Sequence, residues 1–183
     1  MLPDYQLLDA VRHGDFQSVR EAVQRGANVH ARELDGHSAL YLACTEGHMP
    51  IAEYLVGQGA DVNETFGKRQ RTLLHWAAEQ SSTGLATFLI SHGANVNAQQ
   101  SDGSTPLLLA AKHGHHYLVQ LLLKHDALVS PHNANRTTAQ AAAKRAGHHD
   151  IAGLIETAAA SRPSHMQAAE EEFHRRPGER FLF

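Results

Sequence analysis

The sequence is short of the features that secreted and membrane proteins depend on. Its 183 residues include one cysteine, Cys44, which excludes an internal disulfide framework and favours a reducing compartment, the cytoplasm or the nucleus. The start, MLPDYQLLDA, lacks the basic and then apolar pattern of a signal peptide. No apolar run approaches the roughly 18–20 residues that a membrane helix needs, so we expect no membrane partner.

Aromatic residues and an excess of either charge are also scarce. Aromatics make up 6% of the chain, whereas hydrophobic residues make up 42%. A core with so few aromatics must be built from Ala, Leu, Val and Ile, which suits thin helices packed closely together. The formal net charge of -3 argues against nucleic acid as a partner. The length fits one domain with a sizeable core.

What the sequence does contain is an internal repeat. Three markers recur every 33 or 34 residues: RGANVH, QGADVN and HGANVN with glycines at 26, 59 and 93; SALYLAC, TLLHWAA and TPLLLAA from Ser38, Thr72 and Thr105; and EGHMPIAEYL, HGHHYLVQLL and AGHHDIAGLI with Gly47, Gly114 and Gly147. Because three independent markers keep one register, we predict stacked copies of a single structural unit.

The physical character of one unit follows from its residues. Small and apolar residues at helical spacing, Leu40, Ala43 and Cys44, predict a short first helix, which Gly47 ends. A second helix with one apolar face follows and stops at Gly59. The polar residues beyond it are turn-prone and predict a projecting loop. Two short helices and a loop cannot bury their apolar face alone, so the units must stack.

These motifs resemble the ankyrin repeat, a unit of about 33 residues with a β-turn and two helices that opens on Thr-Pro-Leu-His-x-Ala-Ala and closes on Gly-Ala-Asp-Val-Asn. The resemblance implies an all-α fold, an ankyrin-repeat solenoid of stacked helix-turn-helix units with projecting β-turn loops. We predict a repeat domain over 1–160, whose first and last units are degenerate caps, and a helical tail over 161–183. The units are expected near 4–32, 33–66, 67–99, 100–132 and 133–160.

Several positions depart from the family pattern. Only the third unit has the family histidine, His75, because Tyr41 and Leu108 replace it elsewhere. The third unit also has EQSSTG where Gly-His is expected, and its loop, which carries GKRQR, is one residue longer. Asp126 stands where a closing glycine is expected, which predicts a strained or reshaped turn.

The resemblance implies that loop tips and the ends of the inner helices line a concave face that contacts a partner protein. In the loop GKRQR, Lys68, Arg69 and Arg71 are predicted to form a positive field that pairs with carboxylates of the partner. Trp76 is either wedged between inner helices or a partly exposed anchor, and the loop charges could equally be merely solvated. The register places these further residues on the same face: Arg32, Leu34, Asp35, His37, Thr45, Glu46, Glu79, Gln80, Gln99, Ser101, Asp102, Ser104, Lys112 and His113.

We predict neither catalytic residues nor a cofactor. Cys44 occupies the position of a small buried alanine and should behave as a small hydrophobe, and no phosphate loop or His-Glu-x-x-His motif is present. Among the fifteen histidines, those that follow the repeat glycine (48, 115 and 148) are implied by the resemblance to make structural hydrogen bonds, and His75 is a fourth. His113, His116 and His149 could approach one another and bind zinc or nickel adventitiously, but no dedicated metal site is expected.

The function that the sequence favours is a non-catalytic protein–protein interaction module that is monomeric apart from its partner. One alternative is an adaptor or effector whose tail recruits a second protein, and another is binding of a small anion or a metal. The tail is predicted to hold a helix over 164–176, and its last three residues either seal the stack or form a recognition motif. Asn63, in LVGQGADVN, resembles the context of asparagine hydroxylation in ankyrin repeats, or it simply satisfies the loop backbone.

Overall fold

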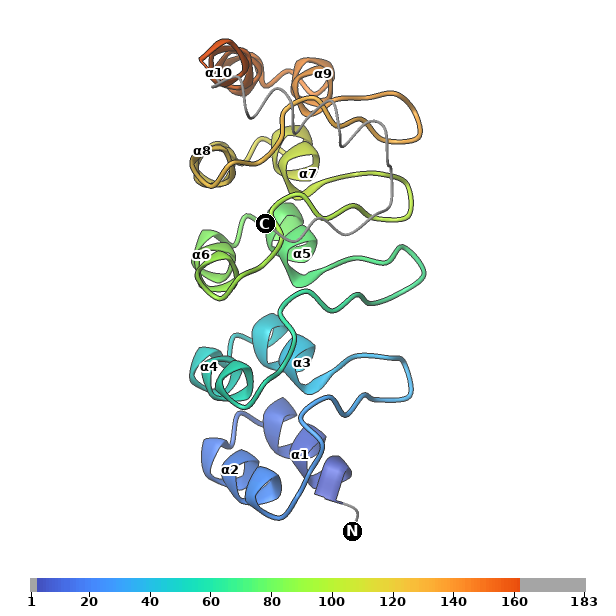
Figure 1. Cartoon of the computed structure of the whole chain (residues 1–183), viewed down its shortest axis with the longest axis vertical. Helices are drawn as coiled ribbons and strands as arrows, with labels where there is room; N and C mark the ends of the chain where they lie inside the picture. The colour runs from blue at the N-terminus through green and yellow to red at the C-terminus, as the bar shows by residue number, and fades with distance from the viewer. Residues whose placement is uncertain (1–2, 162–183) are drawn as a thin grey trace. The chain divides into compact units, whose positions relative to one another are not determined.

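A computed structural model describes residues 3–161, which form ten α-helices (Figure 1). These helices are α1 (Pro3–Arg12), α2 (Phe16–Gln24), α3 (Ala39–Thr45), α4 (Met49–Gly57), α5 (Leu73–Gln80), α6 (Thr83–Ser91), α7 (Pro106–Lys112), α8 (His116–Lys124), α9 (Ala139–Arg145) and α10 (His149–Ala160). Within the described residues there is no regular strand, so the predicted all-α fold is confirmed. The predicted tail helix lies outside the described residues.

The chain divides into two compact parts, each larger than a single repeat; the first ends at Gly67 and the second begins at Lys68. We call these two parts the first unit and the second unit. In the first unit α1 packs on α3 and α2 on α4. In the second unit the inner helices α5, α7 and α9 pack side by side, as do the outer helices α6, α8 and α10. In both units the connecting loops project on the side of the odd-numbered, inner helices (Figure 1).

We call these loops fingers. The first finger is 31–38, the second is 68–72, the third is 98–105 and the fourth is 131–138. The first finger belongs to the first unit and the other three belong to the second unit. Backbone bridges close the base of the first finger, between Arg32 and Ser38, and of the fourth, between His132 and Thr138. In the second unit one backbone hydrogen bond joins each finger to the next, from Ser101 N to Arg69 O at 2.8 Å and from Ala134 N to Asp102 O at 2.7 Å. The finger backbones are therefore fixed by the fold.

The hydroxyl residues that open α3, α7 and α9 are helix caps: Ser38, Thr105 and Thr138. The Ser38 hydroxyl accepts a hydrogen bond from Tyr41 N at 3.0 Å, and Thr138 accepts one from Ala141 N at 3.2 Å. Each cap satisfies one of the amide groups that have no partner at a helix start, which explains why Ser or Thr recurs at this position of the repeat.

Within residues 3–161, four residues other than glycine have a left-handed backbone: Gln70, Ser81, Asp126 and Arg136, with φ between 52° and 62°. Each occupies a repeat position where another unit has a glycine with positive φ. Asp126 has φ 62°, so the predicted strain at this turn is confirmed in its backbone. An L-residue in this region costs roughly 1–2 kcal/mol, somewhat less for Asp.

Two of the repeat histidines have a different role from the one predicted. The rings of His48 and His148 lie directly against Gly14 and Gly114, where an added Cβ would be 2.6 Å from the Cε1 atom of the ring. Among the described residues no hydrogen bond is found for either ring. The expected structural hydrogen bond is wrong for these two, because the ring packs on the bare backbone of the preceding helix turn instead.

We predict that Arg136→Gly stabilises the protein by about 0.5–1 kcal/mol. Glycine adopts the left-handed backbone without steric strain, but the greater conformational entropy of its unfolded chain offsets part of the gain. Chemical denaturation of the wild type and the variant measures the difference. Arg136→Ala is the matched control, since it removes the exposed side chain but keeps the Cβ. An equal gain from Arg136→Ala would contradict the backbone explanation.

Candidate protein-binding surface

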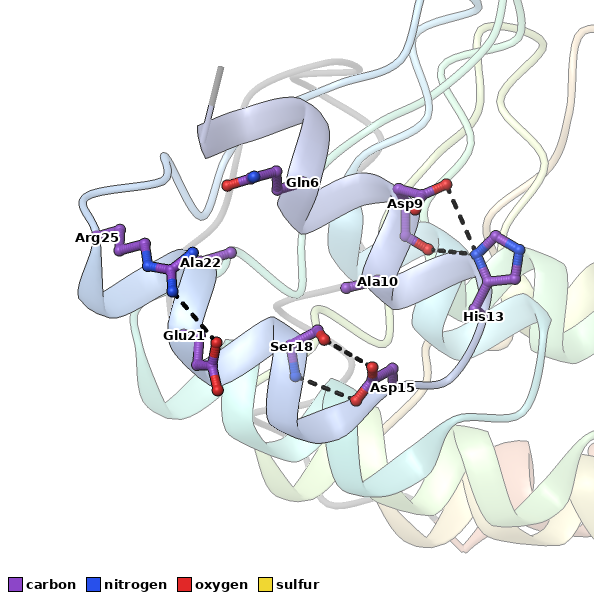
Figure 2. Close-up of a pocket in the computed structure, with 9 residues that line it drawn as sticks. All are labelled: Gln6, Asp9, Ala10, His13, Asp15, Ser18, Glu21, Ala22 and Arg25. Atoms are coloured by element: carbon purple, nitrogen blue, oxygen red, sulfur yellow. Dashed lines mark hydrogen bonds and ion pairs between the residues drawn. The ribbon is translucent and has the colours of Figure 1, made fainter. Parts of the chain in front are cut away.

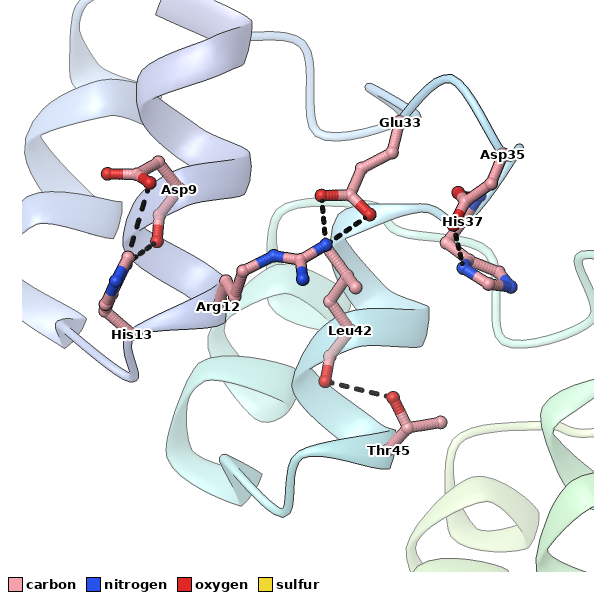
Figure 3. Close-up of polar contacts among 8 residues, drawn as sticks. All are labelled: Asp9, Arg12, His13, Glu33, Asp35, His37, Leu42 and Thr45. Carbon is pink, nitrogen blue, oxygen red and sulfur yellow. Dashed lines mark hydrogen bonds and ion pairs between the residues drawn. The ribbon is translucent and has the colours of Figure 1, made fainter.

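The first finger is tied to the inner helix beneath it by an ion pair (Figure 3). The Arg12 guanidinium, from α1, donates to both carboxylate oxygens of Glu33 at 2.6 and 2.7 Å. Hydrogen bonding and charge from Glu33, with smaller contributions from Glu46 and Asp35, raise the pKa of Arg12. Three carboxylates therefore surround this one cation on the finger side of the first unit.

The tip of the same finger is held by a second pair. The Asp35 carboxylate lies 2.8 Å from Nδ1 of His37 and also accepts the backbone N–H of His37 at 3.0 Å. That backbone hydrogen bond is the main reason why the pKa of Asp35 is lowered. Leu34, between these polar residues, is fully exposed.

Aromatic contacts replace the family histidine in the first unit. The Tyr41 ring, at the position of that histidine, stacks on His37 with ring centroids 4.0 Å apart. It also meets Phe66 edge-on, with centroids 4.6 Å apart. Ring packing thus does in the first unit what a hydrogen-bonded histidine does in the second.

The loop that leads into the second finger contributes a nearly buried carboxylate, Glu64. Arg32 donates to it at 2.8 Å, and the Ser38 hydroxyl also donates to it. Burial nevertheless raises the pKa of Glu64. Arg32, which was predicted to contact a partner, is therefore engaged inside the first unit.

The second finger presents two free cations rather than the three predicted. Arg71 is half-buried and forms an ion pair with Glu79 at the end of α5. Lys68 and Arg69 are exposed, and neither forms an ion pair within residues 3–161. Because Arg69 O accepts the hydrogen bond from the third finger, its side chain projects from a fixed backbone.

His75 is fully buried and links α5 to the third finger. Its Nδ1 is 2.8 Å from the Thr72 hydroxyl, and its Nε2 is 3.1 Å from Ser104 O. Burial, the main cause, lowers the pKa of His75 to about 4, so the ring is neutral at physiological pH. The structural role predicted for His75 is confirmed.

Lys112 and His113, at the end of α7, are both exposed. Partial burial and the neighbouring Lys112 lower the pKa of His113. Next to them Nε2 of His115 lies 3.1 Å from Glu79 O, which confirms the structural hydrogen bond predicted for His115. The end of the following inner helix adds Arg145, which donates to the Thr137 hydroxyl at 2.9 Å.

The remaining predicted contact residues differ in exposure. Trp76 is half-buried, so the structure favours neither of its two interpretations alone. Ser104 is buried, and Thr45 is half-buried with its hydroxyl bonded to Tyr41 O at 2.9 Å. The exposed members of the set are Glu46, Gln80, Ser101 and Asp102, and Gln99 is half-buried.

The residues that could supply chemistry do not form a catalytic arrangement. Cys44 is buried as predicted, and burial raises the pKa of its thiol to about 12, so it is a thiol and not a nucleophilic thiolate. In the described part of the chain the one group of three metal-type ligands is Glu33, Asp35 and His37, whose ligand atoms lie within 4.8 Å of one another. Arg12 already pairs with Glu33. His113, His116 and His149 do not form such a group.

A shallow groove of about 510 Å³ lies between α1 and α2 (Figure 2). Most of its polar lining is paired internally: Ser18 binds Asp15, Arg25 pairs with Glu21, and His13 pairs with Asp9. The groove contains no arrangement that points to a cofactor. Within residues 3–161 no helix combines the length and the hydropathy that a bilayer crossing requires.

A comparison with known protein families agrees with this geometry. The model of "Ankyrin repeats (3 copies)" matches residues 7–100 and 85–161. The chain belongs to the ankyrin-repeat family. Ankyrin repeats generally mediate protein–protein interaction and are typically non-catalytic.

Relatives with different names share the repeats. The chain is 36% identical over 103 residues to the E3 ubiquitin-protein ligase Ufd4 of Drosophila melanogaster, which is 56% of this chain and 4% of that protein. It is 36% identical over 94 residues to Protein fem-1 homolog A-like of Mus musculus, 51% of this chain and 14% of the relative. It is 38% identical over 73 residues to the NF-kappa-B inhibitor cactus of Drosophila yakuba, 40% of this chain and 15% of the relative.

We predict that His75 makes the stability of this ankyrin-repeat protein depend on pH. Because its folded pKa of about 4 lies below its ordinary value of 6.5, the unfolded chain binds the proton more tightly. The stabilisation is complete above about pH 6.5 and is lost as the pH falls toward 4, by up to roughly 3 kcal/mol. Denaturation of the wild type at a series of pH values measures this slope.

The variant His75→Leu, which installs the residue found at the equivalent position 108, should be less stable at pH 7 and have a flatter slope. His125→Leu, at an exposed position, is the control and should keep the wild-type slope. An unchanged slope in His75→Leu would show that other groups cause the pH dependence.

Proposed function

We propose that this chain is a non-catalytic module that binds a partner protein through its fingers and the ends of its inner helices. The observation that carries the proposal is the contrast at the second finger. Its backbone is fixed by the hydrogen bond from Ser101, whereas Lys68 and Arg69 at its tip are exposed and make no ion pair within residues 3–161. Rigid backbones with free side chains bind with little ordering cost.

Charge suggests what the second unit binds. Residues 68–161 contain eight Lys or Arg against five Asp or Glu, although the whole chain is acidic. Lys68, Arg69 and Lys112 are free of ion pairs among the described residues, while Glu79 is taken up by Arg71. An acidic segment of a partner protein is the class of ligand that this surface would attract and orient.

The relatives support protein binding in general and name no shared partner. One is called a ubiquitin ligase and another an inhibitor of NF-kappa-B, and this chain spans at most 15% of either.

The predicted second role of the tail, the cytoplasmic or nuclear location, the monomeric state and the hydroxylation of Asn63 stay predictions. The Asn63 backbone N–H binds the Asp61 carboxylate at 2.8 Å.

The test is a pull-down from cell lysate with the wild type and Lys68→Glu/Arg69→Glu, read by mass spectrometry. We expect at least one protein to be captured about tenfold less by the variant, because two attractive charges become repulsive. Arg71 is left unchanged, since its pair with Glu79 gives it a structural role. The loss should shrink at high salt, where exposed charges are screened.

The matched control is Arg20→Glu/Lys124→Glu, which makes the same change of charge at exposed positions of the outer helices α2 and α8. Circular dichroism verifies that all three proteins are folded. Equal capture by the finger variant and the wild type would contradict binding through the second finger. Equal losses in the finger and control variants would indicate a response to net charge alone.

A further inference from the structure

The backbone N–H groups at one position of the finger tips differ in their hydrogen bonding. In the second unit the N–H of Ser101 donates to the second finger, and the N–H of Ala134, at the equivalent position, donates to the third. The equivalent group in the first unit is the N–H of Leu34. This N–H has no hydrogen-bond partner among the described residues, and neither has the N–H of Lys68 at the same position of the second finger.

Leu34 also presents its side chain to solvent. It is fully exposed at the second position of the turn that the Gly36 N to Glu33 O hydrogen bond closes at 2.9 Å. The fold does not use this side chain. An apolar side chain beside an unpaired donor can contact one extended peptide through both its backbone and a side chain.

The surroundings of Leu34 are acidic. Up to Gly67 the chain has ten Asp or Glu and four Lys or Arg, a formal charge of -6. Three of the four cations are engaged within the unit, as Arg12, Arg25 and Arg32 pair with Glu33, Glu21 and Glu64. The fourth, Arg20, is on the outer helix α2.

Two carboxylates on the finger side have no Lys or Arg paired to them within residues 3–161. Asp35 is more than half exposed and holds only His37, and Glu46, exposed at the end of α3, makes no ion pair among the described residues. Both lie close enough to Arg12 to raise its pKa. The field on this side of the unit is therefore negative even beside its own arginine.

We propose that the first finger binds an extended, cationic segment of a partner protein. A backbone carbonyl of the segment accepts the Leu34 N–H, an apolar side chain covers Leu34, and a Lys or Arg pairs with Asp35 and Glu46. This assignment rests on the proposed function, because it gives one finger surface a class of partner. The opposite charge of the second unit makes the two surfaces selective for different segments.

The test uses fluorescein-labelled octapeptides of alternating Lys and Leu, and of alternating Glu and Leu, titrated onto the full chain by fluorescence anisotropy. EDTA is present, so that a metal held by Glu33, Asp35 and His37 cannot bridge protein and peptide. We expect the Lys peptide to bind at least about tenfold more tightly than the Glu peptide at low salt. No binding of the Lys peptide up to about 1 mM would overturn the proposal.

Variants locate the binding on the finger. Leu34→Ala keeps the N–H and removes the side chain, whereas Leu34→Pro removes both at a turn position that proline favours. We expect Leu34→Ala to weaken the Lys peptide about fivefold and Leu34→Pro to weaken it further. Asp35→Asn/Glu46→Gln should weaken it about tenfold, and Asn can still accept the His37 N–H.

Glu53→Gln, at an exposed position of the outer helix α4, is the control and should bind the Lys peptide as the wild type does. Equal binding by the Leu34 and Asp35/Glu46 variants and the wild type would overturn the proposal. Lys68→Glu/Arg69→Glu should leave the Lys peptide bound. Failure of this inference is therefore distinct from failure of the proposed function, which would appear as equal capture of lysate proteins by that variant and the wild type.

Discussion

The structure depends on the close approach of helices that are too short to be stable alone. Alanines such as Ala110, Ala111 and Ala143 are fully buried in the inner helices of the second unit, and leucines such as Leu107 and Leu122 fill the space between helices. A side chain larger than alanine at these positions would push neighbouring helices apart. Stacking is thus a condition of folding, and it buries the packed helix faces.

That constraint explains where variation is tolerated. The helices must keep their small residues and the turns must keep a backbone with positive φ, even where Ser81 or Arg136 has to adopt it. Finger positions that precede the positive-φ residue of their turn have neither requirement. Leu34 and Arg69 occupy backbone that the fold has already fixed, so their side chains can be chosen by a partner.

The sequence predicted what recurs. The period of 33 or 34 residues was sufficient to predict the helix pairs and the projecting loops, and the burial of Cys44 and the role of His75 followed from their places in the repeat. Asp126 was predicted to be strained because a glycine belongs at its position, and its φ of 62° agrees.

What the sequence did not predict depends on contacts between distant residues. The pair of Arg71 with Glu79 removes one of three predicted finger cations, and no period of the repeat signals it. The packing of His148 on Gly114 requires the relative height of two helix pairs. The unpaired N–H of Leu34 depends on which finger N–H groups meet a carbonyl of a neighbouring finger, and the repeat does not encode this.

The most direct test of the central claim, that partners contact finger tips and not outer helices, is site-specific photo-crosslinking. p-Benzoylphenylalanine would replace Leu34 or Arg69 at the finger tips and, in separate proteins, Arg20 or Lys124 on the outer helices. Each protein is irradiated in cell lysate, and its covalent adducts are identified by mass spectrometry. We predict specific adducts from the finger positions and none from the outer-helix positions. Adducts confined to the outer helices would contradict the account.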